Sequence, residues 1–130
     1  MQMIEKDRIK MDLENKMRIV QELVPGKQIT LAHIIANPDT ILYQKLGLDP
    51  AVDYTGGGAI GIVTMSPSET AVIAADLAMK ASGAELGFVD RFSGTLIITG
   101  SISSVEASLR AILDYTEDKL GFTVCEITRT

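Results

Sequence analysis

The chain has 130 residues, of which 46% are hydrophobic, 22% charged and 5% aromatic, and its net charge is −5. This length and composition favour one globular domain with a single core and exclude wholesale disorder. The acidic charge argues against nucleic acid, which is bound by clustered lysine and arginine. The sequence has neither a secretory signal nor an apolar run long enough to span a bilayer, so we expect a soluble, cytoplasmic protein.

Two segments are predicted to precede the main domain, which begins at residue 27. Residues 1–17 form an N-terminal extension whose apolar side chains at four-residue spacing fit either an amphipathic helix or a frayed tail; these are Ile9, Leu13 and Met17. Residues 18–26 form a β-strand arm, RIVQELV, closed by a Pro-Gly turn. One side of this predicted strand consists of Ile19, Gln21 and Leu23.

A strand and a short helix are expected next. The run KQITLAHII predicts the strand. Asn37 is predicted to cap the helix with Pro38 at its first position, where the missing N–H costs nothing. The helix PDTILYQKLGL is expected to stop near Gly47 and to be followed by a loop, DPAVDYTGGG.

The pattern becomes clearer from residue 58. GAIGIVTM predicts a strand, and Ser66 with Glu69 predicts a capping box at the start of the helix PSETAVIAADLAMKAS. The alanines of this helix suit the close approach of a neighbour, including another subunit. Two strands, AELGFV and TLIIT, are expected on either side of the loop VDRFSG.

A second capping box is predicted from Ser103 and Glu106. The helix after it has one apolar face, made of Val105, Leu109, Ile112, Leu113, Thr116 and Leu120. FTVCEIT is expected to end the chain as a strand. The order from residue 58 onward predicts an α+β fold, a ferredoxin-like split βαβ sandwich in which two helices cover one face of an antiparallel sheet.

Residues that could carry chemistry lack partners at a useful spacing. The run TGGGAIG precedes a strand and does not open a helix, so it predicts a connector and not a phosphate loop. His33 has no neighbours spaced as in a catalytic triad, and with one cysteine, Cys125, no metal pair is predicted. We expect a hydrogen-bonded structural His33, a buried or half-buried Cys125, and no catalytic residue, metal or cofactor.

Residues 59–112 resemble the bacterial microcompartment shell domain. The resemblance is carried by Ala59-Ile60-Gly61, the helix segment AADLAMKA, and Gly100 before Val105-Glu106-Ala107. The segment VQELVPGKQITLAHIIANP looks like the end of an ordinary shell domain, yet here it comes first. With VDRFSG and the terminal CEITRT, this order resembles the circularly permuted shell proteins of the propanediol-utilisation U and ethanolamine-utilisation S types, and makes residues 27–130 a permuted shell domain.

The resemblance implies a non-enzymatic homo-hexamer, a tile of a protein shell around metabolic enzymes in the cytoplasm. Its partners would be other shell proteins and, as a further candidate, the encapsulated enzymes. The loop would lie at the six-fold axis and line an open or capped pore with Asp90, Arg91, Phe92, Ser93 and Gly94. Propanediol, ethanolamine and choline utilisation all remain open as the pathway.

The same resemblance implies roles at the edge and over the pore. Lys80 matches the edge lysine between neighbouring hexamers, and Asn37 stands where ordinary shell domains have an edge arginine, so that half of the edge motif is absent. Copies of the arm at residues 18–26 would join as a small parallel barrel over the pore. Residues 1–17 would dock enzymes or another shell protein.

Two other classes of function remain as alternatives. Split βαβ sandwiches also serve as ligand sensors, so a small-molecule-binding regulatory module is the main one. An enzyme using Asp90, Arg91 and Ser93 ranks last, because no base lies beside Ser93 in the sequence. If Asp90 paired with Arg91 of the same or the next subunit, it would reduce the positive charge of the ring.

Overall fold

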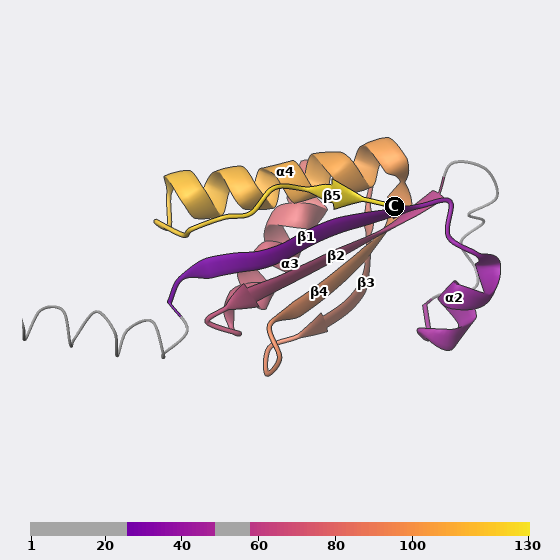
Figure 1. Ribbon diagram of the computed structural model, residues 1–130, viewed down its shortest axis with the longest axis horizontal. Coiled ribbons are helices and arrows are strands. Elements are labelled where there is room, and N and C mark those ends of the chain that lie inside the picture. The colour runs from indigo at the N-terminus through magenta and orange to yellow at the C-terminus, as the bar shows by residue number, and fades with distance from the viewer. Residues whose placement is uncertain (1–25, 49–57) are drawn as a thin grey trace, which may run out of the picture.

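The computed structural model describes residues 26–48 and 58–130 (Figure 1). The predicted N-terminal extension lies outside the described residues, as does nearly all of the predicted arm, including Ile19, Gln21 and Leu23. The predicted loop DPAVDYTGGG lies outside them too, except for its last residue, Gly58, which begins β2. The described elements are β1 (Gln28–Ala36), α2 (Thr40–Lys45), β2 (Gly58–Ser66), α3 (Thr70–Ala81), β3 (Glu85–Asp90), β4 (Thr95–Ser101), α4 (Ile102–Asp118) and β5 (Thr128–Arg129).

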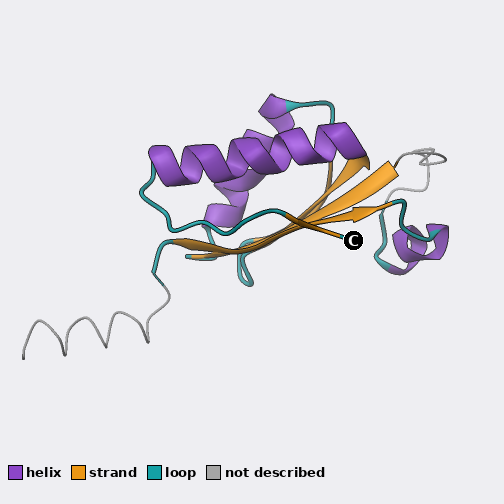
Figure 2. Cartoon of the chain, turned by 45° about the horizontal axis from the view of Figure 1, so that its top comes forward, coloured by secondary structure: helices purple, strands orange, loops and turns teal. Residues whose placement is uncertain are grey.

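The described strands form one sheet in the order β3-β4-β2-β1-β5. Neighbours are antiparallel except β1 and β5, which are parallel. Helices α3 and α4 cover one face of the sheet (Figure 2), whereas α2 lies beyond the end of β1 (Figure 1). The predicted split βαβ sandwich is thus confirmed, with one addition: β1, formed first by the chain, lies between β2 and β5.

The main core lies between the sheet and the two long helices. Its least exposed large side chains, all below 2%, include Ile34, Leu96, Ile98, Val105, Leu109 and Ile112. Gly61 lets α4 approach β2, because a β-carbon there would lie only 2.7 Å from Val105 Cγ1. Burying each such apolar side chain contributes about 1.5–3 kcal/mol. The close approach of Val105 to Gly61 places α4 against β2, the middle strand of the sheet.

The alanines of α3 pack inside their own chain. Ala71, Ala74 and Ala78 are fully buried in the core, and α3 packs against both α4 and β3. The expectation that these residues serve contact with another subunit is therefore wrong. They are small because α3 lies close to its own sheet and to α4.

The start of α2 differs from the prediction. Asp39, and not Asn37, caps the helix: its Oδ1 accepts a hydrogen bond of 3.0 Å from the N–H of Ile41. Asn37 instead adopts a left-handed conformation with φ of 49° and donates its N–H to Gly58 O at 2.8 Å. Asparagine tolerates this conformation better than most residues. The turn at Asn37 therefore delays the helix to Thr40.

Both predicted capping boxes are wrong. Ser66 is the last residue of β2, and Glu69 makes no side-chain cap at the start of α3. In α4 the cap is Ser101, whose Oγ accepts from Ser104 N at 3.1 Å, and not Ser103. The chain passes from β4 directly into α4, so the first free N–H groups come earlier than the capping pattern suggests.

The C-terminal run FTVCEIT is not a continuous strand. Thr123 makes an isolated bridge to Gln28, and regular pairing resumes only at β5. A regular strand would send Val124 and Cys125 to opposite faces, yet both pack against the core. The chain therefore leaves the β1 ladder between these two points and leans toward α4.

Candidate functional site

The loop between β3 and β4 is a tight turn organised by Asp90. One oxygen of this carboxylate, Oδ1, accepts from Phe92 N at 2.8 Å, and the other, Oδ2, accepts from Ser93 Oγ at 2.9 Å. The carbonyl oxygen of Asp90 accepts from Gly94 N at 2.9 Å. The hydrogen bond from Phe92 N, followed by that from Ser93, lowers the pKa of Asp90 below its usual value. The carboxylate is thus part of the turn itself.

Gly94 fixes the loop to the end of β2. Its φ is 73°, a conformation that favours glycine, and a β-carbon there would collide with Met65 O. Its carbonyl oxygen accepts from Met65 N at 2.9 Å. Glycine is thus required at position 94 for two reasons, the left-handed backbone of the turn and the close approach of Met65.

Phe92 and Arg91 form the exposed tip of the loop. The Phe92 side chain is 80% exposed, and the Arg91 guanidinium carbon lies 5.0 Å from the centre of its ring, a cation–π contact. Within the described part of one chain, Arg91 makes this contact and no ion pair with Asp90. The pairing envisaged within one subunit is therefore absent there.

The loop brings Ser93 against Asp90, whereas His33 lies elsewhere in the sheet. Ser93 Oγ lies 2.9 Å from Asp90 Oδ2 and 3.0 Å from Thr95 Oγ1. The ring nitrogens of His33 lie 2.6 Å and 2.9 Å from the hydroxyls of Thr128 and Thr130, respectively. β4 and β2 separate β3 from β1, the strand of His33, so His33 lies away from the hairpin that carries Ser93. The predicted hydrogen-bonded structural histidine is confirmed.

Neither a metal centre nor a membrane span is found in the described part of the chain. Across residues 26–48 and 58–130, His, Cys, Asp and Glu side chains make no group of three that could hold a metal ion. None of the described helices is both long and apolar enough to cross a membrane. The candidate sites on the described residues are therefore surfaces and loops.

Lys80 and Asn37 lie at the end of the domain opposite to the loop. Lys80 is next to last in α3, which runs back from the loop end of β2 to the start of β3, and Asn37 N bonds to Gly58, which pairs with Ser101 at the far end of β4. The Lys80 ammonium lies 2.7 Å from Asp76 Oδ2, and this hydrogen bond raises the pKa of Lys80. This pair was not predicted from the sequence, although its i,i+4 spacing is a signal for one.

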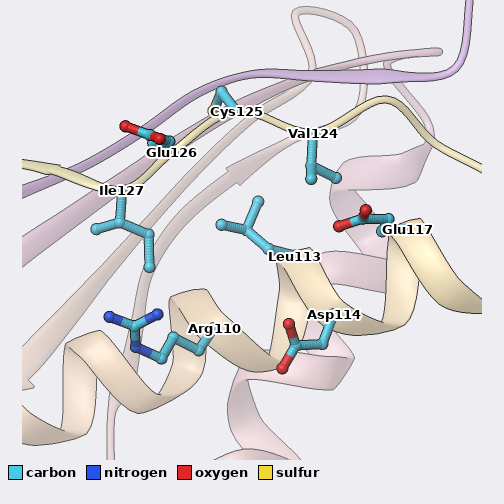
Figure 3. A pocket seen from close by; sticks show the side chains of 8 residues that line it. All are labelled: Arg110, Leu113, Asp114, Glu117, Val124, Cys125, Glu126 and Ile127. Atoms are coloured by element: carbon cyan, nitrogen blue, oxygen red, sulfur yellow. The ribbon is translucent and has the colours of Figure 1, made fainter.

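A shallow groove of about 340 Å³ lies between α4 and the C-terminal segment (Figure 3). It is lined by Arg110, Leu113, Asp114, Glu117, Val124, Cys125, Glu126 and Ile127. Cys125 is half-buried, as predicted. Arg110 pairs with Glu106 at 3.1 Å, and the other charged side chains that line the groove are the carboxylates of Asp114, Glu117 and Glu126.

The fold and loop together define a class of protein. Residues 59–128, more than half of the chain, match the family model of the BMC domain, so the chain belongs to the BMC-domain family. It is 51% identical to the bacterial microcompartment shell protein EutS of Salmonella typhimurium over 116 residues, which cover 89% of this chain and 99% of EutS. It is 50% identical to the shell protein PduU of the same organism over 113 residues, 87% of this chain and 93% of PduU.

A solved structure of CutR as a flat hexamer is also similar. It shares 48% sequence identity and a TM-score of 0.74, with coverage of 82% of this chain and 94% of CutR. The resemblance to permuted shell proteins and the α+β fold are thereby confirmed. The family match begins in β2, so β1 precedes the matched residues in the sequence. β1 nevertheless lies inside the sheet, between β2 and β5, as circular permutation predicts.

Proposed function

We propose that this chain is a structural protein of a bacterial microcompartment shell and assembles as a homo-hexameric tile. The observation that carries the proposal is the identity of about half of all aligned residues to shell proteins over nearly their whole length. The similar CutR structure, itself a flat hexamer, supports the oligomeric state. The partners are other shell proteins, and the location is the shell of a compartment in the cytoplasm.

In this proposal the loop from Asp90 to Gly94 lines a central pore. The loop is the tip of a hairpin, its backbone is held by its own hydrogen bonds, and its outermost side chain, Phe92, is mostly exposed. Six copies would place six Arg91 guanidinium groups around one opening and set its local charge. The Asp90 carboxylates, already engaged within each loop, would offset part of that charge.

The proposed tile performs no catalysis. Ser93, the one hydroxyl of the loop, contacts a carboxylate and a threonine, and the histidine of the described chain is engaged at the other side of the sheet. The group that accepts the Ser93 hydroxyl proton is the Asp90 carboxylate, and the hydrogen bonds of the turn lower the pKa of Asp90 and make it a weak base, so Ser93 is a poor nucleophile. The function supported by the loop is therefore structural and selective.

The remaining assignments rest on the resemblance and on position. Lys80 and Asn37 would lie at the rim of the tile, since both are remote from the loop at its centre. Residues 18–26 would form the barrel over the pore, and residues 1–17 would dock enzymes or another shell protein.

Native mass spectrometry of the full-length chain tests the proposal. A hexamer is expected at micromolar concentration. A monomer or dimer that becomes more stable on adding a metabolite would reject the shell tile and support the small-molecule-binding regulatory module instead.

A further inference from the structure

The groove between α4 and the C-terminal segment has an apolar floor and an acidic rim. Leu113 is buried, Val124 and Ile127 pack half-buried against the main core, and all three line the groove (Figure 3). Its one cation, Arg110, pairs with Glu106. The remaining charged side chains of the lining are carboxylates, those of Asp114, Glu117 and Glu126. The groove therefore favours a ligand that combines apolar side chains with positive charge.

The first residues of the chain carry that combination. Ile9, Leu13 and Met17 make one apolar stripe when residues 1–17 form the amphipathic helix that their spacing fits. At about 100° per residue around such a helix, the charged side chains nearest to the stripe are those of Lys6, Lys10 and Lys16. The acidic side chains lie further from it. The stripe thus matches the apolar floor, and the lysines match the carboxylates of the rim.

The two surfaces also agree in length. The groove follows α4 from Arg110 to Glu117, which is about 10 Å at 1.5 Å per residue. A helical stripe from Ile9 to Met17 is about 12 Å long. The stripe is therefore long enough to cover the floor of the groove from end to end.

The chain enters its first strand at one end of this groove. The carbonyl oxygen of Lys27 accepts from Thr123 N at 3.0 Å, and Lys27 Nζ donates to Leu120 O at 3.4 Å. Thr123 directly precedes the stretch that lines the groove. Residues 18–26 span up to about 30 Å when extended, so they can return residues 1–17 to any point along it. Such a tether gives an effective concentration in the millimolar range, and a weak contact is then well occupied.

We propose that residues 1–17 dock in the groove of their own chain whenever no partner holds them. The inference goes beyond the proposed function, which gives these residues a docking role, and states where they lie before a partner is bound. The contact withholds the apolar stripe from other proteins, so a partner must compete with the groove for it. Because the contact joins two parts of one chain, it does not require the hexamer.

The reaction of Cys125 with a maleimide reports whether the groove is covered, since Cys125 lines the groove and is the only cysteine of the chain. Leu13→Asp places a charge in the middle of the stripe and should raise the modification rate about fivefold or more. Ile4→Asp is the matched control, because Ile4 falls on the opposite side of the helix, and it should leave the rate unchanged. Circular dichroism melting checks that both variants keep the folded domain.

Disulfide trapping identifies the chain that supplies the segment. In Leu13→Cys, mild oxidation should join residue 13 to Cys125 within one chain, which runs as a monomer on a denaturing gel without reductant. Ile4→Cys is the control and should be trapped far less. Trapping between two chains, a yield from Leu13→Cys no higher than from Ile4→Cys, or a Cys125 rate that Leu13→Asp does not change would overturn docking in the chain's own groove. Each result is obtained from a hexamer or a monomer alike, so the proposed function stands or falls separately by native mass spectrometry.

Discussion

The carbonyl oxygen of Met65 occupies the space that a β-carbon of residue 94 would need. Gly94 also has a φ of 73° and accepts a hydrogen bond from Met65 N. One glycine therefore sets the shape of the loop and joins it to β2. The candidate pore loop is held in place by the same sheet that makes the core.

Replacing Gly94 should destabilise the fold. Gly94→Ala adds a left-handed conformation unsuited to alanine, about 1–2 kcal/mol, and displaces Met65, with loss of a hydrogen bond of about 1 kcal/mol. We expect the free energy of unfolding to fall by about 2–3 kcal/mol in urea titrations at fixed protein concentration. Gly83→Ala is the control, since a β-carbon there meets nothing within 4 Å. Equal losses in both variants would contradict this explanation of Gly94.

The lowered pKa of Asp90 predicts a pH dependence. Because its folded-state pKa lies below the unfolded value of about 4, the carboxylate stabilises the fold above that value. The stabilisation disappears as the pH falls through the folded-state pKa.

Asp90→Asn tests this dependence. The variant should melt at a lower temperature than wild type at pH 7, and the difference should shrink as the pH falls below about 4. Asp114→Asn removes a carboxylate from α4, outside the loop, and serves as the control. A difference between Asp90→Asn and wild type that stays constant from neutral to acid pH would show that the loop does not depend on this charge.

His33 should hold the C-terminal strand. Its two ring nitrogens meet the hydroxyls of Thr128 and Thr130, and β5 has only two residues. His33→Ala removes both contacts, so we expect a loss of about 1–2 kcal/mol and faster hydrogen exchange at residues 128–130. The double variant Thr128→Val and Thr130→Val should behave in the same way. If hydrogen exchange at residues 128–130 is unchanged in either variant, β5 is held by its backbone hydrogen bonds and by Phe122, and not by His33.

Lys80 should matter between hexamers and not within them. Its ion pair with Asp76 is exposed on both sides, and such pairs contribute little to folding. Lys80→Ala should therefore leave the melting temperature and the hexamer nearly unchanged, and electron microscopy should show fewer extended sheets for this variant than for wild type. Lys45→Ala, in the last turn of α2, is the comparison. Normal sheets from Lys80→Ala would remove this residue from the rim assignment.

The elements with strong periodicity were predictable, and their ends were not. The apolar spacing of α4 holds for Val105, Leu109 and Ile112, because one face of a long helix must meet the core. The capping patterns failed at Ser66, which still belongs to β2, and at Ser103, because Ser101 accepts the hydrogen bond from the first turn of α4.

Contacts between segments far apart in the chain could not be predicted from the sequence either. The clash that requires glycine at position 94 comes from Met65, 29 positions earlier (94 − 65), and no local pattern reveals it. The irregular course of residues 124–127 follows from packing against α4. The hydrogen bonds of Asp90 in the turn are easier to predict from the sequence, because aspartate followed by serine and glycine is typical of a turn stabilised by a side chain.

An electron cryomicroscopy map of the full-length assembly tests the proposed hexameric tile most directly. We expect a ring of six chains with the β3–β4 hairpin tips around the axis and with Lys80 and Asn37 at the rim. A map in which the loops from Asp90 to Gly94 face outward, or in which the chains do not form a six-membered ring, would contradict it.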